Sequence, residues 1–154
     1  MLDPSLLIRD ARLDDLDDIF KIEQRSFTDP YPKGLLEAFF YLPGVYIVAV
    51  SEEEVIGYAV GIIRYESLGH VVSIAVDEAM RRKGVGERLM KETIKRLCSK
   101  GTKRVRIEVR ESNVPAIRLY TKLGFTVEGK IKRYYADGES ALLMYLNVKL
   151  CPRR

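Results

Sequence analysis

The feature that most constrains this chain is an apolar stretch that runs into a basic, glycine-containing turn and then into an amphipathic helix. Residues 73–76 have β-type apolar character and end at Asp77, and residues 81–86 read Arg-Arg-Lys-Gly-Val-Gly. Apolar residues then recur at helical spacing to about Ser99, and Gly101 stands where a helix C-terminal glycine belongs. The turn is therefore predicted to join a strand to the N-terminus of a helix.

This turn is predicted to bind a phosphate or diphosphate. Unpaired N–H groups and the positive end of the helix dipole face outward at a helix N-terminus, and glycines let an anion approach the backbone closely. The contacts to this anion that we expect in the turn come from Arg81, Arg82, Lys83, Gly84, Val85 and Gly86. The alternative interpretation is an ordinary strand-to-helix turn with a solvated basic face.

Two nucleotide-binding motifs do not fit the turn. A Walker loop needs Gly-Lys-Ser/Thr, which the sequence lacks. The dinucleotide fingerprint needs a third glycine where this chain has Leu89, and it usually follows the first strand.

Size and composition indicate one globular domain over residues 1–154, since 47% of the residues are hydrophobic and 31% are charged. No apolar run approaches the ~20 residues of a membrane helix, and residues 1–4 lack the order of a signal peptide, so we expect a cytoplasmic protein without membrane contact. The net charge of +4 suits an anionic ligand or a ribonucleoprotein neighbourhood but is too small to predict direct nucleic-acid binding. No Cys/His spacing indicates a metal site.

The order of elements predicts a mixed α/β fold on one central sheet. Strands are expected over residues 6–9, 45–50, 55–64, 70–76, 104–109, 125–135 and 141–150. Helices are expected over residues 13–26, 35–42, 85–99 and 114–123. The last two strands form a hairpin around residues 136–139. The prediction is a mostly antiparallel sheet of about seven strands with about four helices.

The chain resembles the GCN5-related N-acetyltransferase (GNAT) superfamily over residues 8–150. The most specific marker is the R/Q-x-x-G-x-G/A turn, met by Arg81, Gly84 and Gly86. Within the superfamily it is most similar to the ribosomal-protein-alanine N-acetyltransferases and the archaeal N-terminal acetyltransferases. The matching stretches are residues 74–77, 107–113, 116–120, 123–125 and 133–135.

The resemblance implies that acetyl-coenzyme A (acetyl-CoA) is the acetyl donor and that the turn holds its pyrophosphate. It also implies that main-chain groups of Ile74, Ala75 and Val76 pair with the pantetheine arm like an added strand. Asn113 matches a cofactor-contacting position.

Acetyl transfer from a thioester to an amine requires a proton acceptor and a proton donor for the leaving thiolate. Glu108, on a predicted central strand, matches the family's general base; its alternative role is an ion pair with Arg104 or Arg106. Tyr120 matches the general acid that reaches the cofactor sulfur, and its alternative role is helix packing. His70 matches a position that helps to relay the proton in some N-terminal acetyltransferases, or has no role.

The resemblance places the acceptor groove between the loop after the first helix and the final hairpin. Aromatic residues suited to line it are Phe27, Tyr31, Tyr134 and Tyr135, with rim packing as the alternative. The amine of a protein N-terminus has a pKa of about 8 and that of a lysine side chain about 10.4. At neutral pH the N-terminal amine therefore costs less free energy to deprotonate, so one carboxylate base suits it better. Tyr31 stands where bacterial relatives often carry tryptophan, which leaves the peptide preference open.

The leading hypothesis is therefore an N-acetyltransferase acting on protein N-termini, with ribosomal proteins among its candidate substrates. The alternatives are acetylation of lysine side chains or small polyamines, or a non-catalytic module that binds acyl-CoA. We expect a monomer or a weak homodimer.

Overall fold

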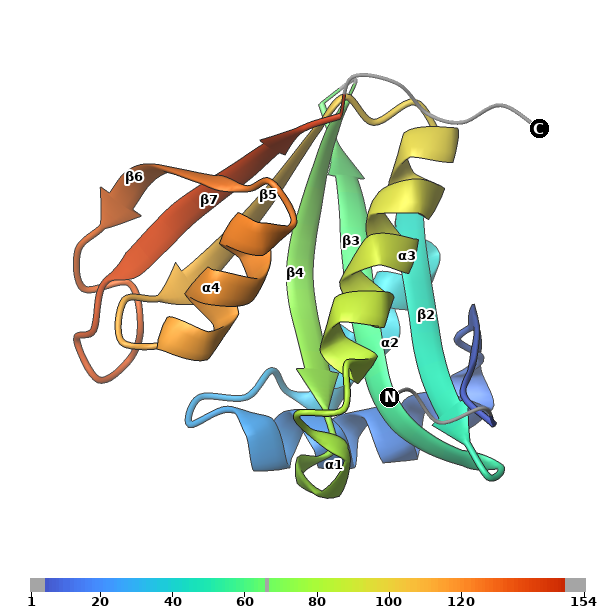
Figure 1. Ribbon diagram of the computed structural model, residues 1–154. Coiled ribbons are helices and arrows are strands. Elements are labelled where there is room, and N and C mark those ends of the chain that lie inside the picture. The colour runs from blue at the N-terminus through green and yellow to red at the C-terminus, as the bar shows by residue number, and fades with distance from the viewer. Residues whose placement is uncertain (1–4, 66, 149–154) are drawn as a thin grey trace.

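The computed structural model describes residues 5–65 and 67–148, and its centre is a seven-stranded sheet in the order β1-β2-β3-β4-β5-β7-β6 (Figure 1). The strands are β1 Leu7–Asp10, β2 Gly44–Ser51, β3 Glu54–Arg64, β4 Leu68–Val76, β5 Arg104–Arg110, β6 Thr126–Ile131 and β7 Ala141–Asn147. The helices are α1 Leu16–Ser26, α2 Lys33–Ala38, α3 Val85–Ser99 and α4 Val114–Lys122. Neighbouring strands pair antiparallel apart from β4 and β5, so the predicted fold class is confirmed.

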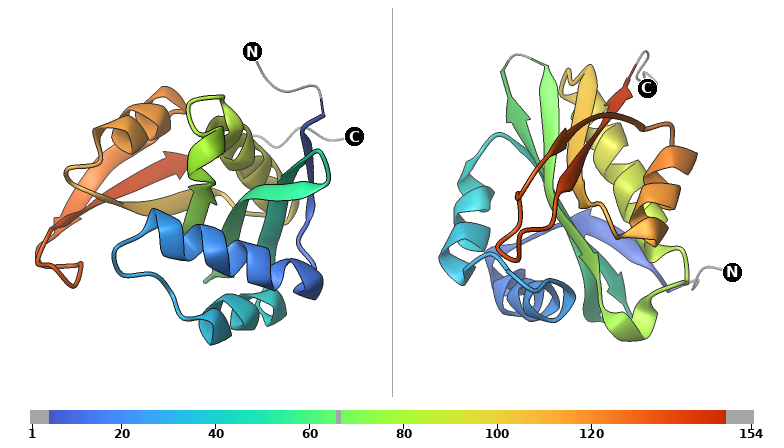
Figure 2. Two further views of the ribbon diagram at one scale, coloured as in Figure 1. Left: turned by 90° about the horizontal axis from the view of Figure 1, so that it is seen from below. Right: turned by 90° about the vertical axis from the view of Figure 1, so that its left-hand side faces the viewer.

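Helices cover both faces of the sheet (Figure 2). Helices α1 and α2 pack on one face in a cluster that includes Ile19 and Leu36, and α3 packs on the other in a cluster that includes Leu89 and Met90. Side chains of α4 join the second cluster. Successive strand residues alternate between the two clusters, as the period of two requires.

The sheet opens between β4 and β5. Within the described residues these parallel strands pair only from Leu68 with Arg104 to Val71 with Ile107. The β3–β4 register skips Val72, which marks a β-bulge, and such bulges bend the strand that carries them. Beyond the bulge, β4 and β5 diverge (Figure 1), and no strand of residues 5–65 or 67–148 lies beside the second half of β4 on the β5 side.

Several predicted boundaries change in the structure. The strand expected over residues 125–135 ends at Ile131, because Arg133 takes a left-handed φ of 54° that breaks the extended backbone. The helix expected over residues 35–42 is α2 followed by a 3₁₀ turn at Phe39–Tyr41, and the first helix begins as a 3₁₀ turn at Leu13–Asp15. Residues 149–150 of the last expected strand lie outside the described residues. None of the described helices has the length and apolar character needed to cross a membrane.

Candidate active site

A cavity of about 510 Å³ fills the gap where β4 and β5 separate. It is lined by Phe27, Tyr31, His70, Ile74, Glu108, Asn113, Tyr120, Tyr134 and Tyr135, all of them predicted site residues. Ile107 and Val109 lie on the face of β5 that packs with α3 and α4, and Glu108 projects from the opposite face. Tyr120 comes from α4, on the same side of the sheet as Ile107 and Val109. The gap between the strands therefore joins the two faces of the sheet in one cavity.

His70 and Glu108 form a close pair at the narrow end of this gap. His70 Nε2 lies 2.8 Å from both carboxylate oxygens of Glu108, and the two side chains are 13% and 8% exposed. In the ladder, His70 sits opposite Arg106, two residues before Glu108 on the same face. Arg106 Nε also lies 3.5 Å from Glu108 Oε2, so the ion pair considered for Glu108 exists beside the histidine contact. Arg104 instead pairs with Glu128.

The pKa of Glu108 is lowered by its neighbours. Burial alone would raise this pKa, but the hydrogen bond and charge of His70 and of Arg106 outweigh burial. The carboxylate is therefore ionised at neutral pH and can only accept hydrogen bonds, so Nε2 of His70 carries the shared hydrogen.

Tyr120 retains its proton at neutral pH. Its side chain is 7% exposed, and burial raises its pKa to about 12. The ring also packs against Phe125, at a centroid distance of 5.8 Å, so the packing role considered for this residue is present. A protonated phenol that lines the cavity is a proton donor for a developing anion.

The basic turn leads into α3 as predicted. Arg82 and Gly84 have left-handed φ values of 62° and 80°, and the turn residues before α3 are exposed. A Cβ added to Gly86 would meet only Val76 Cγ2, at 3.8 Å, so this side of the helix start is open to a ligand. These features fit a phosphate-bearing group, because the first N–H groups of a helix lack intrahelical partners.

Two side chains of the predicted cofactor site have structural contacts of their own. Arg81 Nε donates to the Val76 carbonyl at 3.0 Å, and its guanidinium also reaches Ser26 Oγ at 3.1 Å. Asn113 caps α4, with its Oδ1 accepting from the Ala116 N–H at 3.2 Å. The guanidinium of Arg81 thus lies near the end of β4, where it uses one of the two lone pairs of the Val76 carbonyl.

The main chain of β4 fits the strand-like pairing implied by the resemblance. Ile74 and Ala75 lie beyond the last β4–β5 pair, and Ile74 lines the cavity. The side chains of Ala75 and Val85 are buried in the two core clusters, so only their main-chain groups are available to a ligand.

The predicted aromatic residues lie on two opposite walls. On the α1–α2 side, Phe27 is 38% exposed, and the Tyr31 hydroxyl donates to the Val72 carbonyl at 3.1 Å. On the β6–β7 side, the Tyr134 hydroxyl donates to Glu108 Oε1 at 3.3 Å, and its ring meets Tyr135 edge-on at 5.0 Å. The second wall therefore touches the carboxylate directly.

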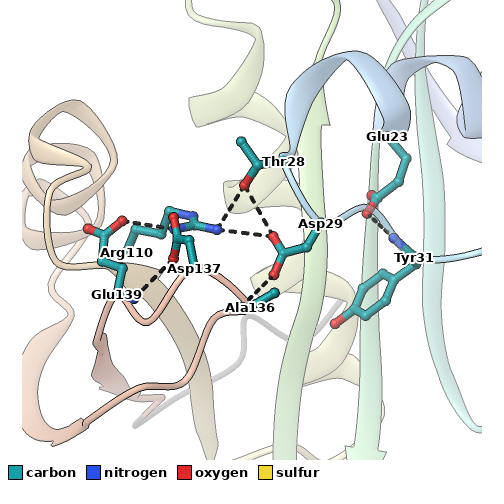
Figure 3. A network of polar contacts seen from close by, with 8 residues as sticks. All are labelled: Glu23, Thr28, Asp29, Tyr31, Arg110, Ala136, Asp137 and Glu139. Atoms are coloured by element: carbon teal, nitrogen blue, oxygen red, sulfur yellow. Dashed lines mark hydrogen bonds and ion pairs between the residues drawn. The ribbon is translucent and has the colours of Figure 1, made fainter.

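Sequence reasoning missed several polar residues of the cavity, and two of them, Glu23 and Arg110, join distant elements. Glu23 of α1 is 2% exposed and accepts hydrogen bonds from Tyr58, from Ser73 Oγ at 2.9 Å and from the Tyr31 N–H at 2.9 Å. Its place on the apolar side of the helix was a signal of burial. Arg110, at the end of β5, bridges both walls (Figure 3), and no local pattern in the sequence indicates this.

A family model described as the acetyltransferase (GNAT) family matches residues 16–125. The chain belongs to this family. An N-alpha-acetyltransferase from Saccharolobus solfataricus is 39% identical over 89% of this chain and 90% of the relative. A putative [ribosomal protein bS18]-alanine N-acetyltransferase from Bacillus subtilis is 34% identical over 92% and 95%. Among solved structures, Ard1 from Thermoplasma volcanium has a TM-score of 0.91 and 31% identity, covering 95% of this chain and 99% of that one. The GNAT fold and the acetyltransferase class predicted from the sequence are confirmed.

Proposed function

We propose that this GNAT enzyme transfers the acetyl group of acetyl-CoA to the N-terminal α-amino group of proteins, through a single N-acetyltransferase domain over residues 1–154. The observation that carries the proposal is the His70–Glu108 pair at the narrow end of the cavity, in hydrogen-bond reach of Tyr134. The N-alpha-acetyltransferases that align along nearly the whole chain support it.

The donor binds at the α3 side of the gap. The turn of residues 81–86 supplies helix N–H groups and positive charge for the pyrophosphate, since coenzyme A carries roughly four negative charges. The main chain of residues 74–76 pairs with the pantetheine arm, and Asn113 contacts the cofactor from the start of α4. This places the thioester beside Tyr120 and Glu108.

In the reaction, the neutral amine nitrogen attacks the thioester carbonyl carbon, so a C–N bond forms and the C–S bond breaks. The His70–Glu108 pair accepts the proton that the amine loses, directly or through one water molecule. Tyr120 donates its phenolic proton to the departing thiolate. No covalent intermediate on the enzyme is required.

The acceptor enters between the two aromatic walls. An N-terminal amine needs roughly 1.4 kcal/mol for deprotonation at neutral pH, against roughly 4.6 kcal/mol for a lysine, which suits a single carboxylate. A polyamine would require an acidic rim, and three rim carboxylates, Asp29, Asp137 and Glu139, share the single cation of Arg110, so acetylation of a small polyamine is the second candidate function. Ribosomal proteins are candidate substrates by analogy with the Bacillus subtilis relative, which is named for ribosomal protein bS18, and the cytoplasm is where such N-termini emerge.

The test is incubation with acetyl-CoA and a panel of peptides that vary in their first two residues and also contain an internal lysine. Mass spectrometry then locates the acetyl group. We expect α-amino labelling that depends on the first two residues. Labelling of the lysine ε-amines with free N-termini ignored would disprove the proposal.

A further inference from the structure

We propose that Arg110 is a positioning residue that holds the two walls of the acceptor groove together. We call its contacts the Arg110 clasp, made with Thr28 and Asp29 on one wall and with Tyr135, Asp137 and Glu139 on the other. The inference rests on the proposed function, because it concerns how the peptide acceptor is held over Glu108.

The first set of contacts in the Arg110 clasp binds the loop between α1 and α2. The Nη2 group of Arg110 donates to Thr28 Oγ1 at 2.9 Å and to Asp29 Oδ1 at 3.0 Å. A few residues on, the same loop is fixed a second time, where Glu23 accepts from the Tyr31 N–H. The loop that carries Phe27 and Tyr31 is therefore anchored both to α1 and to β5 (Figure 3).

The second set of contacts in the Arg110 clasp binds the loop between β6 and β7. The Nη1 group lies 2.9 Å from Asp137 Oδ2 and 2.9 Å from Glu139 Oε1, and the guanidinium stacks over the Tyr135 ring at 4.0 Å. Glu139 in turn accepts from the Ser112 N–H at 2.8 Å. These contacts order the loop that brings Tyr134 to Glu108.

The walls also meet each other through the same carboxylate. Asp29 Oδ2 accepts from the Ala136 N–H at 3.4 Å, so one side chain of the first loop contacts both Arg110 and the backbone of the second loop (Figure 3). Without the guanidinium, this 3.4 Å contact between the loops remains, but both walls lose the link to β5 that Arg110 provides.

Arg110 lies on the same strand as Glu108, so it can fix the distance from both walls to this carboxylate. Arg110 follows Glu108 by two residues in β5, so the two side chains share a face about 7 Å apart along the strand. An arginine suits this place because its planar guanidinium offers five donors in a fixed fork, whereas a lysine offers a point charge. The clasp thus sets the width of the groove at a fixed distance from the reacting nitrogen.

The test compares two acceptors, the best peptide of the panel above and the amide of its first residue alone. The amide reaches only the part of the walls beside Glu108, whereas the peptide extends between the loops that Arg110 joins, so the clasp predicts a defect that depends on acceptor length. For Arg110→Ala we expect kcat/KM for the peptide to fall by about 10- to 100-fold, in line with the cost of misplacing a substrate. For the amide we expect a change below about threefold, and the KM for acetyl-CoA stays constant.

Companion variants keep the test decisive if Arg110→Ala folds poorly. Arg110→Lys keeps the charge, and Asp29→Asn keeps the size of the loop-side partner; both should show a smaller loss with the same length dependence. The matched control is Arg96→Ala, which removes an arginine of α3 that pairs with Asp10 of β1 and with Glu92 of α3. This variant should keep kcat/KM for both acceptors within about twofold of the wild-type value.

Equal losses on the two acceptors, or no loss on the peptide, would overturn the clasp. Those outcomes differ from failure of the proposed function, which shows in the wild-type enzyme as labelling of lysine ε-amines with N-termini ignored.

Discussion

At the residue scale, the balance of forces on Glu108 defines its chemical state. Burial and its polar neighbours act in opposite directions on the pKa, and the neighbours prevail. Contact with His70 and Arg106 keeps Glu108 ionised at neutral pH, so the carboxylate is free to accept a proton.

Replacing the carboxylate should therefore abolish most of the activity. We expect Glu108→Gln to lower kcat by about 10²- to 10⁴-fold, the usual contribution of a general base, with an unchanged KM for acetyl-CoA. Steady-state kinetics on the best peptide measure this. Glu128→Gln is the matched control, because Glu128 is also a strand glutamate paired with an arginine but lies outside the cavity lining. A loss in the control variant as large as that in Glu108→Gln would contradict the assignment.

The same pKa shift predicts how stability changes with pH. The pKa of Glu108 is lower in the folded state than in the unfolded state, so the unfolded chain binds more protons in acid. The contribution of the ionised carboxylate is present above about pH 4.3 and is lost as pH falls through the folded pKa. The free energy of unfolding of the wild type, relative to Glu108→Gln, should decrease from about pH 6 to about pH 3.5. Urea denaturation at both pH values tests this, and a constant difference would refute it.

At the element scale, the start of α3 leaves space for a ligand to come close to the backbone. Gly84 holds a left-handed backbone that favours glycine, whereas Gly86 has no such φ and lies within the first turn of the helix. A methyl group at Gly86 meets nothing closer than 3.8 Å. The fold therefore does not require glycine at this position, and we propose that the bound phosphate does.

The variant Gly86→Ala separates these two requirements. Since alanine favours a helix over glycine by up to about 1 kcal/mol, the melting temperature should hold or rise. The added methyl group obstructs the phosphate, so the KM for acetyl-CoA should increase about tenfold, equivalent to about 1.4 kcal/mol. Gly34→Ala is the control, because Gly34 is also the second residue of its helix, α2. An added Cβ at Gly34 meets nothing within 4 Å. An unchanged KM in Gly86→Ala would argue against the phosphate site.

At the scale of the whole molecule, the opening between β4 and β5 creates the site, and buried polar contacts hold its surroundings together. Glu23 joins α1 to β3 through Tyr58, to β4 through Ser73 and to the acceptor loop through Tyr31. These partners are far apart in the sequence, so one carboxylate fixes three elements around the cavity.

Truncating this carboxylate should destabilise the protein. The Tyr58 and Ser73 hydroxyls lie 2.7 Å apart, so one of them can still donate to the other in Glu23→Ala. The variant therefore leaves one hydroxyl and the Tyr31 N–H without an acceptor, and we expect a loss of about 2–4 kcal/mol in the free energy of unfolding. Glu23→Gln keeps one acceptor oxygen and should cost less. Chemical denaturation measures both, with the exposed Glu37→Ala as a control expected to stay within about 0.5 kcal/mol. A Glu23→Ala variant as stable as this control would exclude the joining role.

The sequence alone determined those features that depend on local spacing. Alternation in residues 104–109 assigned Glu108 to the face opposite the core, and the glycines and basic residues of 81–86 defined a turn at a helix N-terminus. Tertiary structure decided which distant residues meet. His70 and Glu108 are 38 positions apart, and their contact depends on the parallel register of β4 and β5. The Arg110 clasp likewise depends on two loops that only the folded sheet brings together. The physical reason is that side-chain periodicity fixes the face on which a residue lies, whereas its neighbours are set by strand order, register and the bulge that opens the sheet.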